Sequence, residues 1–156
     1  MYQSILVPVD GSATSECGLD EAIKLGKLTG AKLRLIHVVD ELSFAISAGY
    51  GAVGSFDIIS LLREAGGEIL SKAKARVQAS GLEVDTVLID SFEGRVCDLV
   101  LAQVGIWGAD LIVLGTHGRR GVGRLFMGSD AENIVRTSTI PVLLLRVDPA
   151  AAHPNT

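Results

Sequence analysis

The chain of 156 residues is 48% hydrophobic and 21% charged, which allows a sizeable core and excludes a disordered protein. Its formal net charge of −4 excludes a broad basic surface for nucleic acid, so we expect no nucleic-acid partner. Aromatic residues make up only 4% of the chain, and an aliphatic composition of this kind suits a buried parallel sheet.

Further features of the sequence favour a cytoplasmic protein. The start MYQSILVPVDGS has neither a basic segment nor a long apolar run, so it does not resemble a secretion signal. No apolar run reaches the roughly 18 residues of a membrane helix, so we expect no membrane insertion. Cys17 and Cys97 lie far apart and form no metal-binding pattern, which favours two reduced thiols.

The first third of the chain predicts a strand, a helix, a second strand and a loop. Residues 5–9 and 33–39 are short apolar runs of the kind that buried strands have. Residues 14–29 lie between them and place apolar side chains on one helical face. Residues 43–55 contain three glycines and little periodicity, which predicts a mobile loop that can cover a ligand.

The middle of the chain predicts a long helix followed by a third strand. Residues 57–80 form an amphipathic helix that contains the adjacent glycines Gly66 and Gly67. Each glycine costs about 1 kcal/mol relative to alanine, so the pair indicates a kink or a close packing contact. Residues 84–89 form the third strand, and its polar side chains favour an edge of the sheet.

The last third predicts two more helices and two more strands. Residues 94–107 and 129–138 have helical periodicity, and residues 111–114 and 141–147 are apolar runs. We expect a single domain that ends with the last run, at residue 147, and a flexible tail over residues 148–156. Strict alternation of strand and helix predicts an α/β fold with an open, twisted, five-stranded parallel sheet and helices on both faces.

A glycine-rich loop before the last helix is the candidate binding site. Its glycines follow the spacing Gly115-x2-Gly118-x9-Gly128, and Ser129 comes next. Gly115 and Gly118 would let the backbone approach a ligand, while Gly128 and Ser129 would offer N–H groups and a hydroxyl to phosphate oxygens. Ser129-x-x-Glu132 is equally a capping box, in which Ser129 caps the helix without a ligand. Both interpretations stay open from these residues alone.

Other phosphate- and cofactor-binding motifs do not fit. The loop segment Gly118-x4-Gly123-Arg124-Leu125 lacks the lysine and the hydroxyl residue of a P-loop, and no GxGxxG follows the first strand. A response-regulator receiver would need an acidic cluster where Asp10 stands alone, and a lysine on the last strand. A flavodoxin would need well-placed aromatic residues, which the chain does not offer.

No catalytic set stands out among the polar residues. Asp10, Ser12 and His117 can be drawn as a triad, but nothing in the sequence fixes their geometry. His37 is typical of a packed or hydrogen-bonded histidine rather than a ligand. One of the three loop arginines is expected to meet a phosphate, and these are Arg119, Arg120 and Arg124. We do not expect an efficient enzyme.

The order of the motifs resembles that of the universal stress protein family. The family pattern Gly-x2-Gly-x9-Gly-Ser/Thr, then a short helix and a strand opening with Pro-Val, is matched by GTHGRRGVGRLFMGS and by Pro141-Val142. The Pro/Val-x-Asp-Gly-Ser pattern of the first strand is matched by VPVDGSATSE, and LIHVVDE resembles the second strand. The resemblance implies the Rossmann-like sheet of adenine nucleotide alpha hydrolases, for which we expect the strand order 3-2-1-4-5.

The resemblance also implies the ATP-binding branch of the family. Pro8, Val9 and Asp10 would then sit by the ribose and base, and Val38 would contact the adenine. The remaining implied contacts, to ribose and phosphates, come from Gly115, Thr116, His117, Gly118, Arg119, Gly128, Ser129 and Asp130. ATP, ADP or AMP would be the ligand, with Mg²⁺ held by phosphate oxygens and water rather than by side chains.

The expected function is that of a cytoplasmic regulatory or stress-response protein whose partner the sequence does not name. ATP would order the loop over residues 116–127 and shift the protein between states that partners read. The resemblance implies a homodimer, which we place at the apolar last strand, Pro141–Val147, and which could extend to a higher oligomer. Two alternatives stay open, namely a slow ATP-hydrolysing enzyme and a nucleotide-free dimeric adaptor.

Overall fold

A computed structural model describes residues 1–40, 55–90, 92, 94–116 and 127–146 of the chain. The predicted loop at residues 43–55 falls mostly outside this part, as do His117, Gly118, Arg119 and the predicted tail. In chain order the elements are β1 (Ser4–Pro8), α1 (Ala13–Thr29), β2 (Lys32–Val39), α3 (Ser55–Ala79), β3 (Val84–Asp90), α4 (Val96–Trp107), β4 (Leu111–Gly115), α5 (Ser129–Thr137) and β5 (Val142–Leu145).

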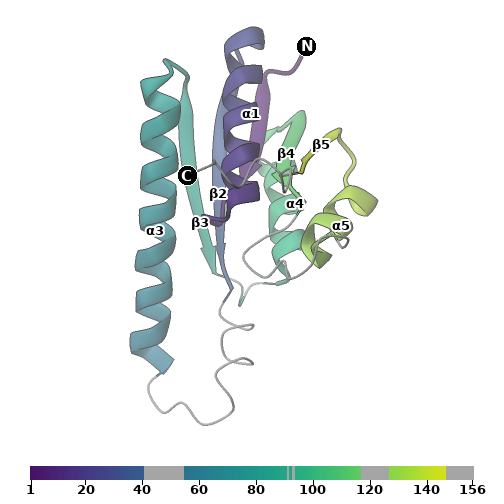
Figure 1. Ribbon diagram of the computed structural model, residues 1–156. Helices are drawn as coiled ribbons and strands as arrows, with labels where there is room; N and C mark the ends of the chain where they lie inside the picture. Colours follow the sequence, from purple (N-terminus) through teal and green to yellow (C-terminus); the bar gives the residue numbers. More distant parts are fainter. Residues whose placement is uncertain (41–54, 91, 93, 117–126, 147–156) are drawn as a thin grey trace, which may run out of the picture.

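The five strands form one parallel sheet in the order β3-β2-β1-β4-β5, as predicted (Figure 1). β1 lies at the centre, where Ile5 is paired with Leu33 of β2 on one side and with Leu111 of β4 on the other. The predicted edge position of the third strand is confirmed, and β5 forms the opposite edge. The regular β5 is shorter than the apolar run that predicts it, since it ends at Leu145.

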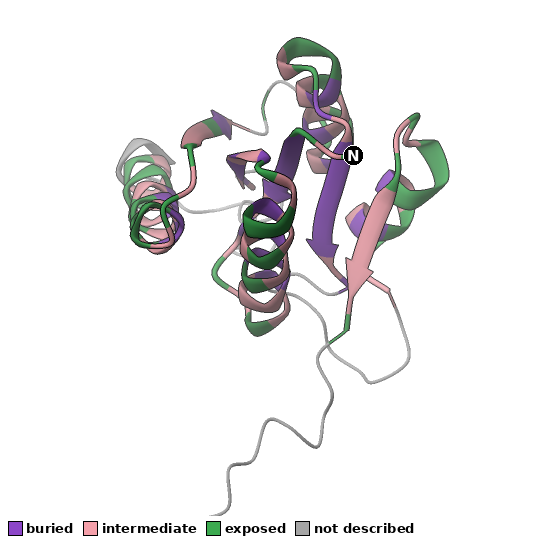
Figure 2. Ribbon diagram, turned by 90° about the horizontal axis from the view of Figure 1, so that it is seen from above, coloured by how far each residue is buried: buried purple, intermediate pink, exposed green. Residues whose placement is uncertain are grey.

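Side chains that alternate along the strands separate into two cores, one on each face of the sheet. One core packs against α1 and α3, and its strand residues include Ile5, Val7, Leu33, Leu35 and Val113. The other packs against α4 and α5, and its strand residues include Leu6, Ile36, Ile112 and Leu114. Buried residues are therefore concentrated in the strands and exposed ones on the outer sides of the helices (Figure 2). Burial on both faces explains why these strands read as continuous apolar runs.

Glycines shape two helices at the positions that the sequence singled out. Gly30 ends α1 with a φ of 75°, a left-handed conformation that costs glycine little. In α3 the predicted close contact is found at Gly66, where an added Cβ would lie 2.6 Å from Cδ2 of His37. An added Cβ at Gly67 would meet open space. Among the described residues, no helix is both long enough and apolar enough to cross a membrane.

Candidate functional site

The ends of β1, β2 and β4 and the starts of α1 and α5 lie at the carboxyl edge of the sheet (Figure 1). The chain leaves β1 for a helix on one face and leaves β4 for a helix on the other, because α1 and α5 belong to different cores. β1 and β4 are neighbours, so the strand order reverses between them. Ligands of open α/β sheets bind at such a switch point, which makes this edge the candidate site.

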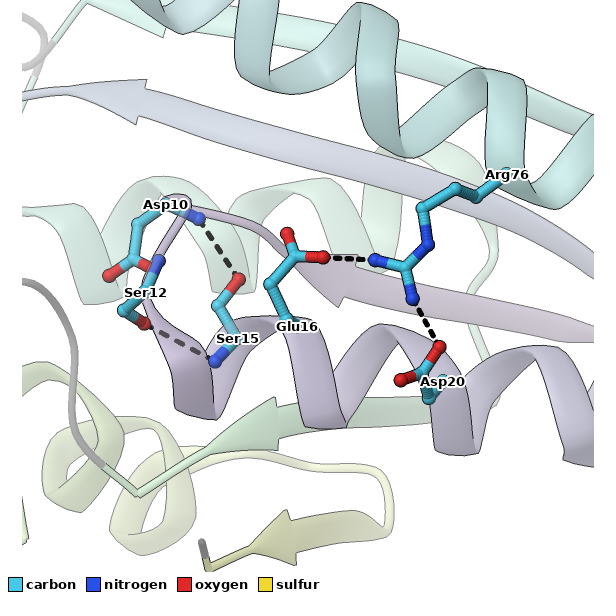
Figure 3. Close-up of polar contacts among 6 residues, drawn as sticks. All are labelled: Asp10, Ser12, Ser15, Glu16, Asp20 and Arg76. Carbon is cyan, nitrogen blue, oxygen red and sulfur yellow. Dashed lines mark hydrogen bonds and ion pairs between the residues drawn. The ribbon is translucent and has the colours of Figure 1, made fainter. Parts of the chain in front are cut away.

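The turn between β1 and α1 is held by its own polar side chains (Figure 3). The Asp10 N–H donates to Ser15 Oγ at 3.1 Å, and the Ser12 N–H donates to Asp10 Oδ1 at 2.9 Å. Ser12 Oγ then accepts from the Ser15 N–H at 3.2 Å, which caps the helix. Gly11 between them takes a φ of 78°. Sequence reasoning missed Ser15, which sits three residues after Ser12, where a capping side chain finds its N–H.

Gly115 at the end of β4 lies directly against the start of α1. An added Cβ would come within 2.7 Å of three Thr14 atoms, two of them in the backbone. Real Cβ atoms do not approach backbone so closely, so this contact requires glycine. The predicted role of Gly115, close approach to a ligand, is a separate matter, because helix packing already accounts for the residue. The contact brings the β1–α1 turn and the end of β4 together.

Hydrogen bonds of Thr116 join the end of β4 to β5 and to the start of α5. Its N–H donates to the Leu145 carbonyl, and its own carbonyl accepts from the Gly128 N–H, each at 2.8 Å. The Thr116 side chain is buried at 2% exposure. The two ends of the glycine-rich loop are thus held side by side, and Gly128 reaches the site although twelve positions separate it from Thr116 in sequence.

The start of α5 corrects the capping-box interpretation. The helix begins at Ser129, and Gly128 occupies the cap position with extended φ and ψ of −58° and 145°. Gly128 has no side chain with which to cap, so the cap carries no side-chain hydrogen bond. Ser129 is one residue too late to be the N-cap, because the Gly128 bond to Thr116 fixes where the extended chain ends. The first-turn N–H groups of α5 are therefore not satisfied by the box that the sequence suggested.

The residues implied at the nucleoside end lie at the ends of β1 and β2. Pro8, Asp10 and Val38 are half-buried, whereas the Val9 side chain is 2% exposed and packs in the core beneath α1 and α3. Val9 can therefore meet a ligand only through its backbone. Val38 lies against the other core. The structure brings these residues to the candidate edge, and their contacts with a nucleoside stay a prediction.

The polar groups around the site provide few means of covalent or metal chemistry. Among the described residues, no group of three or more His, Cys, Asp or Glu side chains could hold a metal ion. Cys97 packs in the α4–α5 core at 2% exposure, where burial raises the pKa of its thiol and the negative charges of Asp98 and Asp130 add to that rise. A thiol of this kind is a poor nucleophile near neutral pH.

Comparisons of the sequence and of the structure with known proteins point to the same family. A profile of the universal stress protein family matches residues 1–146. Universal stress protein MJ0531 of Methanocaldococcus jannaschii is 35% identical over 147 residues, which cover 94% of this chain and 83% of that protein. The solved structure of a second protein of that organism, MJ0577, has a TM-score of 0.83 at 24% identity and covers 96% of this chain and 99% of its own.

A universal stress protein of Archaeoglobus fulgidus, solved in complex with dAMP, has a TM-score of 0.64 at 22% identity. That match covers 92% of this chain and 97% of the other. These two solved structures share the fold described above. The family profile spans nearly the whole chain, and the chain belongs to the universal stress protein family.

Proposed function

We propose that this protein binds ATP, or the related ADP or AMP, at the carboxyl edge between β1 and β4. The observation that carries the proposal is the meeting of the β1–α1 turn with the start of α5, whose cap position is a glycine, at the switch point of the sheet. A nucleotide needs a phosphate site and a nucleoside site side by side, and these two segments supply them. The dAMP complex of a relative with the same fold supports an adenine nucleotide as the ligand class.

The phosphates bind at the start of α5. The N–H groups of its first turn face out of the helix end, where the helix dipole favours negative charge, and Ser129 at the first helical position provides a hydroxyl. Gly128 leaves the backbone accessible there, and Thr116 fixes its position. His117, Gly118 and Arg119, outside the described residues, complete the phosphate site with Gly115. Asp130 lies in the first turn of α5 and faces the site through its backbone.

The nucleoside binds at the ends of β1 and β2. Asp10 is held in place by its bond to Ser12, which prepares its carboxylate to meet a ribose hydroxyl. Pro8 and the Val9 backbone form one wall, and the half-buried Val38 offers apolar surface to the base. This division of roles needs no catalytic residue, in keeping with a site that recognises its ligand.

Mg²⁺ fits this site as a partner of the phosphates. The first turn of α5 carries the acidic residues Asp130 and Glu132, and a bound triphosphate adds further negative charge. Mg²⁺ would neutralise part of that charge. It would be held mainly by phosphate oxygens and water, because Mg²⁺ sites usually use only one or two protein carboxylates. ATP binding should therefore weaken when Mg²⁺ is removed with a chelator, and titration calorimetry with and without the metal checks this.

The biological role that we propose is regulatory and cytoplasmic. ATP orders the glycine-rich loop and favours one of two states that a partner protein distinguishes. The protein acts as a homodimer through the exposed edge of β5, where apolar residues are half-buried in the single chain. A slow ATPase and a nucleotide-free adaptor are the competing candidates. Multiple turnover in a steady-state assay of the ATP-loaded protein would favour the ATPase.

Ligand release tests the binding proposal directly. Protein purified under native conditions is denatured, and mass spectrometry identifies the small molecules that leave it. We expect an adenine nucleotide, together with a rise in melting temperature when ATP and Mg²⁺ are added. An empty fraction with no thermal shift would favour the adaptor.

A variant with Gly118→Val and Ser129→Ala tests the location of the site. It should abolish nucleotide binding while its circular dichroism stays that of the wild type. Gly105→Val on α4 is a control, because a Cβ at Gly105 meets no atom within 4 Å and lies outside the site. Retained affinity in the double variant would place the site elsewhere.

A further inference from the structure

His37 is a buried polar side chain next to the candidate site. It lies near the carboxyl end of β2 and is only 6% exposed. Its Nδ1 is 2.7 Å from the carbonyl oxygen of Val9. A carbonyl oxygen can only accept, so Nδ1 carries the hydrogen and donates it. A buried imidazole is retained for its hydrogen bonds, because an apolar side chain would fill the same space without a desolvation cost.

The acceptor of this bond directly precedes the turn that holds Asp10. Val9 is bound to β2 twice, since its N–H donates to the Ile36 carbonyl at 2.8 Å and its carbonyl accepts from His37. β1 itself ends one residue earlier, at Pro8. His37 therefore extends the attachment of the chain to β2 up to the last residue before Asp10.

The position of the imidazole is set in turn by α3. An added Cβ at Gly66 would lie 2.6 Å from Cδ2 and 3.0 Å from Nε2 of His37, and 2.9 Å from Cδ1 of Leu88. The helix backbone thus lies directly against the ring edge that faces away from Val9. At the neighbouring Gly67, an added Cβ would have no atom within 4 Å. Only the first of the two glycines is required by the ring.

We propose that His37 is a positioning residue for nucleotide binding, and that Gly66 makes α3 part of the support of the site. His37 does not touch the ligand; it holds the Val9 carbonyl and through it the Asp10 turn. A shift of α3 would move the ring and thereby change the position of the Asp10 turn at the nucleoside end of the site. This inference rests on the proposed nucleotide site.

Two substitutions of His37 separate positioning from packing. The side-chain nitrogen of asparagine can take the place of Nδ1, whereas leucine fills the space without a donor. We expect His37→Leu to weaken ATP binding about tenfold by calorimetry, equivalent to about 1.4 kcal/mol. His37→Asn should stay within a few-fold of the wild type, even though both variants lose stability in urea. Equal affinities of the two variants would overturn the role of the hydrogen bond.

A second pair of variants acts on the other side of the ring and keeps His37 itself. Gly66→Ala should lower ATP affinity severalfold, because the added Cβ displaces the imidazole. Gly67→Ala is the matched control, with the same change of one methyl group one residue along α3 and wild-type affinity expected. If His37→Leu does not fold, this pair decides the matter, since equal affinities of the two alanine variants would overturn the proposal.

Nitrogen NMR of the imidazole provides a measurement that does not depend on the stability of the fold. In the wild type we expect Nδ1 of His37 to carry a hydrogen at neutral pH, and an unprotonated Nδ1 would overturn the proposed bond. A wild-type protein without affinity for ATP would overturn the proposed function and this inference with it. Wild-type affinity in the His37→Leu variant would overturn the inference alone.

Discussion

The two helices that begin at the candidate site begin in different ways. At α1 the chain provides its own cap, since Ser12 accepts from the Ser15 N–H and Asp10 accepts from the Ser12 N–H. At α5 the cap position is Gly128, which carries no side chain, and Ser129 already belongs to the helix. Among the described residues, the same sheet edge thus holds one helix start whose cap residue bonds through its side chain and one whose cap residue is a glycine.

This difference indicates which helix start can receive an anion. N–H groups that already have side-chain acceptors gain little from a phosphate, because binding would replace one acceptor by another. At the start of α5 the cap residue is a glycine, so a phosphate there displaces no cap side chain and gains the benefit of the helix dipole. The comparison therefore favours α5 for phosphates and the β1–α1 turn for the uncharged part of a nucleotide.

The largest expected effect on stability comes from Gly115→Ala, which should push the start of α1 away from the end of β4. The added Cβ would overlap the backbone of Thr14 at 2.7 Å, so α1 or β4 must move. Overpacking of this kind costs up to about 3 kcal/mol in the free energy of unfolding, which urea denaturation measures. Nucleotide affinity should fall as well, because the turn and the start of α5 lose their common support.

Gly18→Ala is the matched control for that variant. Gly18 faces Gly115 across the same contact, and its added Cβ would lie at an ordinary 3.5 Å from the Gly115 N. We expect a stabilisation of up to about 1 kcal/mol, from the higher helix propensity of alanine. A similar loss of stability in both variants would mean that the contact is generally intolerant and that Gly115 is not special.

The parallel sheet could be predicted because its signals are local and repeated, whereas the expected strand order rested on the family resemblance. The inner strands are buried on both faces and so appear as continuous apolar runs, and strict alternation with helices leaves few topologies. Gly66 and Gly67 were expected to mark a kink or a close contact because glycine is costly inside a helix, and the close contact is found at Gly66 alone. His37 was expected to be packed or hydrogen-bonded, and it is both.

The details that decide the site could not be predicted, because they depend on distant contacts. Ser129 and Glu132 have the spacing of a capping box, yet the bond from Gly128 to Thr116 moves the helix start by one residue. The space that Gly115 leaves is filled by Thr14, a hundred residues earlier in the chain. Neither partner is visible in a local motif, so these structural roles of Gly115 and Gly128 could not be predicted from the sequence.

A pair of serine variants sharpens the comparison between the helix starts. Ser12→Ala removes the cap of α1 and should lower the free energy of unfolding by about 1 kcal/mol. Ser129→Ala removes no cap and should change it by less than about 0.5 kcal/mol, as at other exposed positions. Thermal or urea unfolding of both proteins checks this, and equal losses would contradict the difference between the two helix starts.

The smallest expected effect concerns the link between α3 and the start of α1. Arg76 of α3 reaches across to the carboxylates of Glu16 and Asp20 on α1, as Figure 3 shows. All three side chains are more than a third exposed, so solvent and salt screen the attraction. Arg76→Met keeps most of the apolar stem and should cost less than about 1 kcal/mol.

The salt dependence of this loss shows whether charge or packing causes it. If the ion pairs stabilise the start of α1, the difference between the wild type and Arg76→Met should shrink as salt is raised from low ionic strength to 1 M. Lys24→Met removes the pair with Glu21, which lies within α1 and links no other element, and it should change stability less at any salt concentration. A loss for Arg76→Met that salt does not alter would assign the contact to packing of the arginine stem rather than to charge.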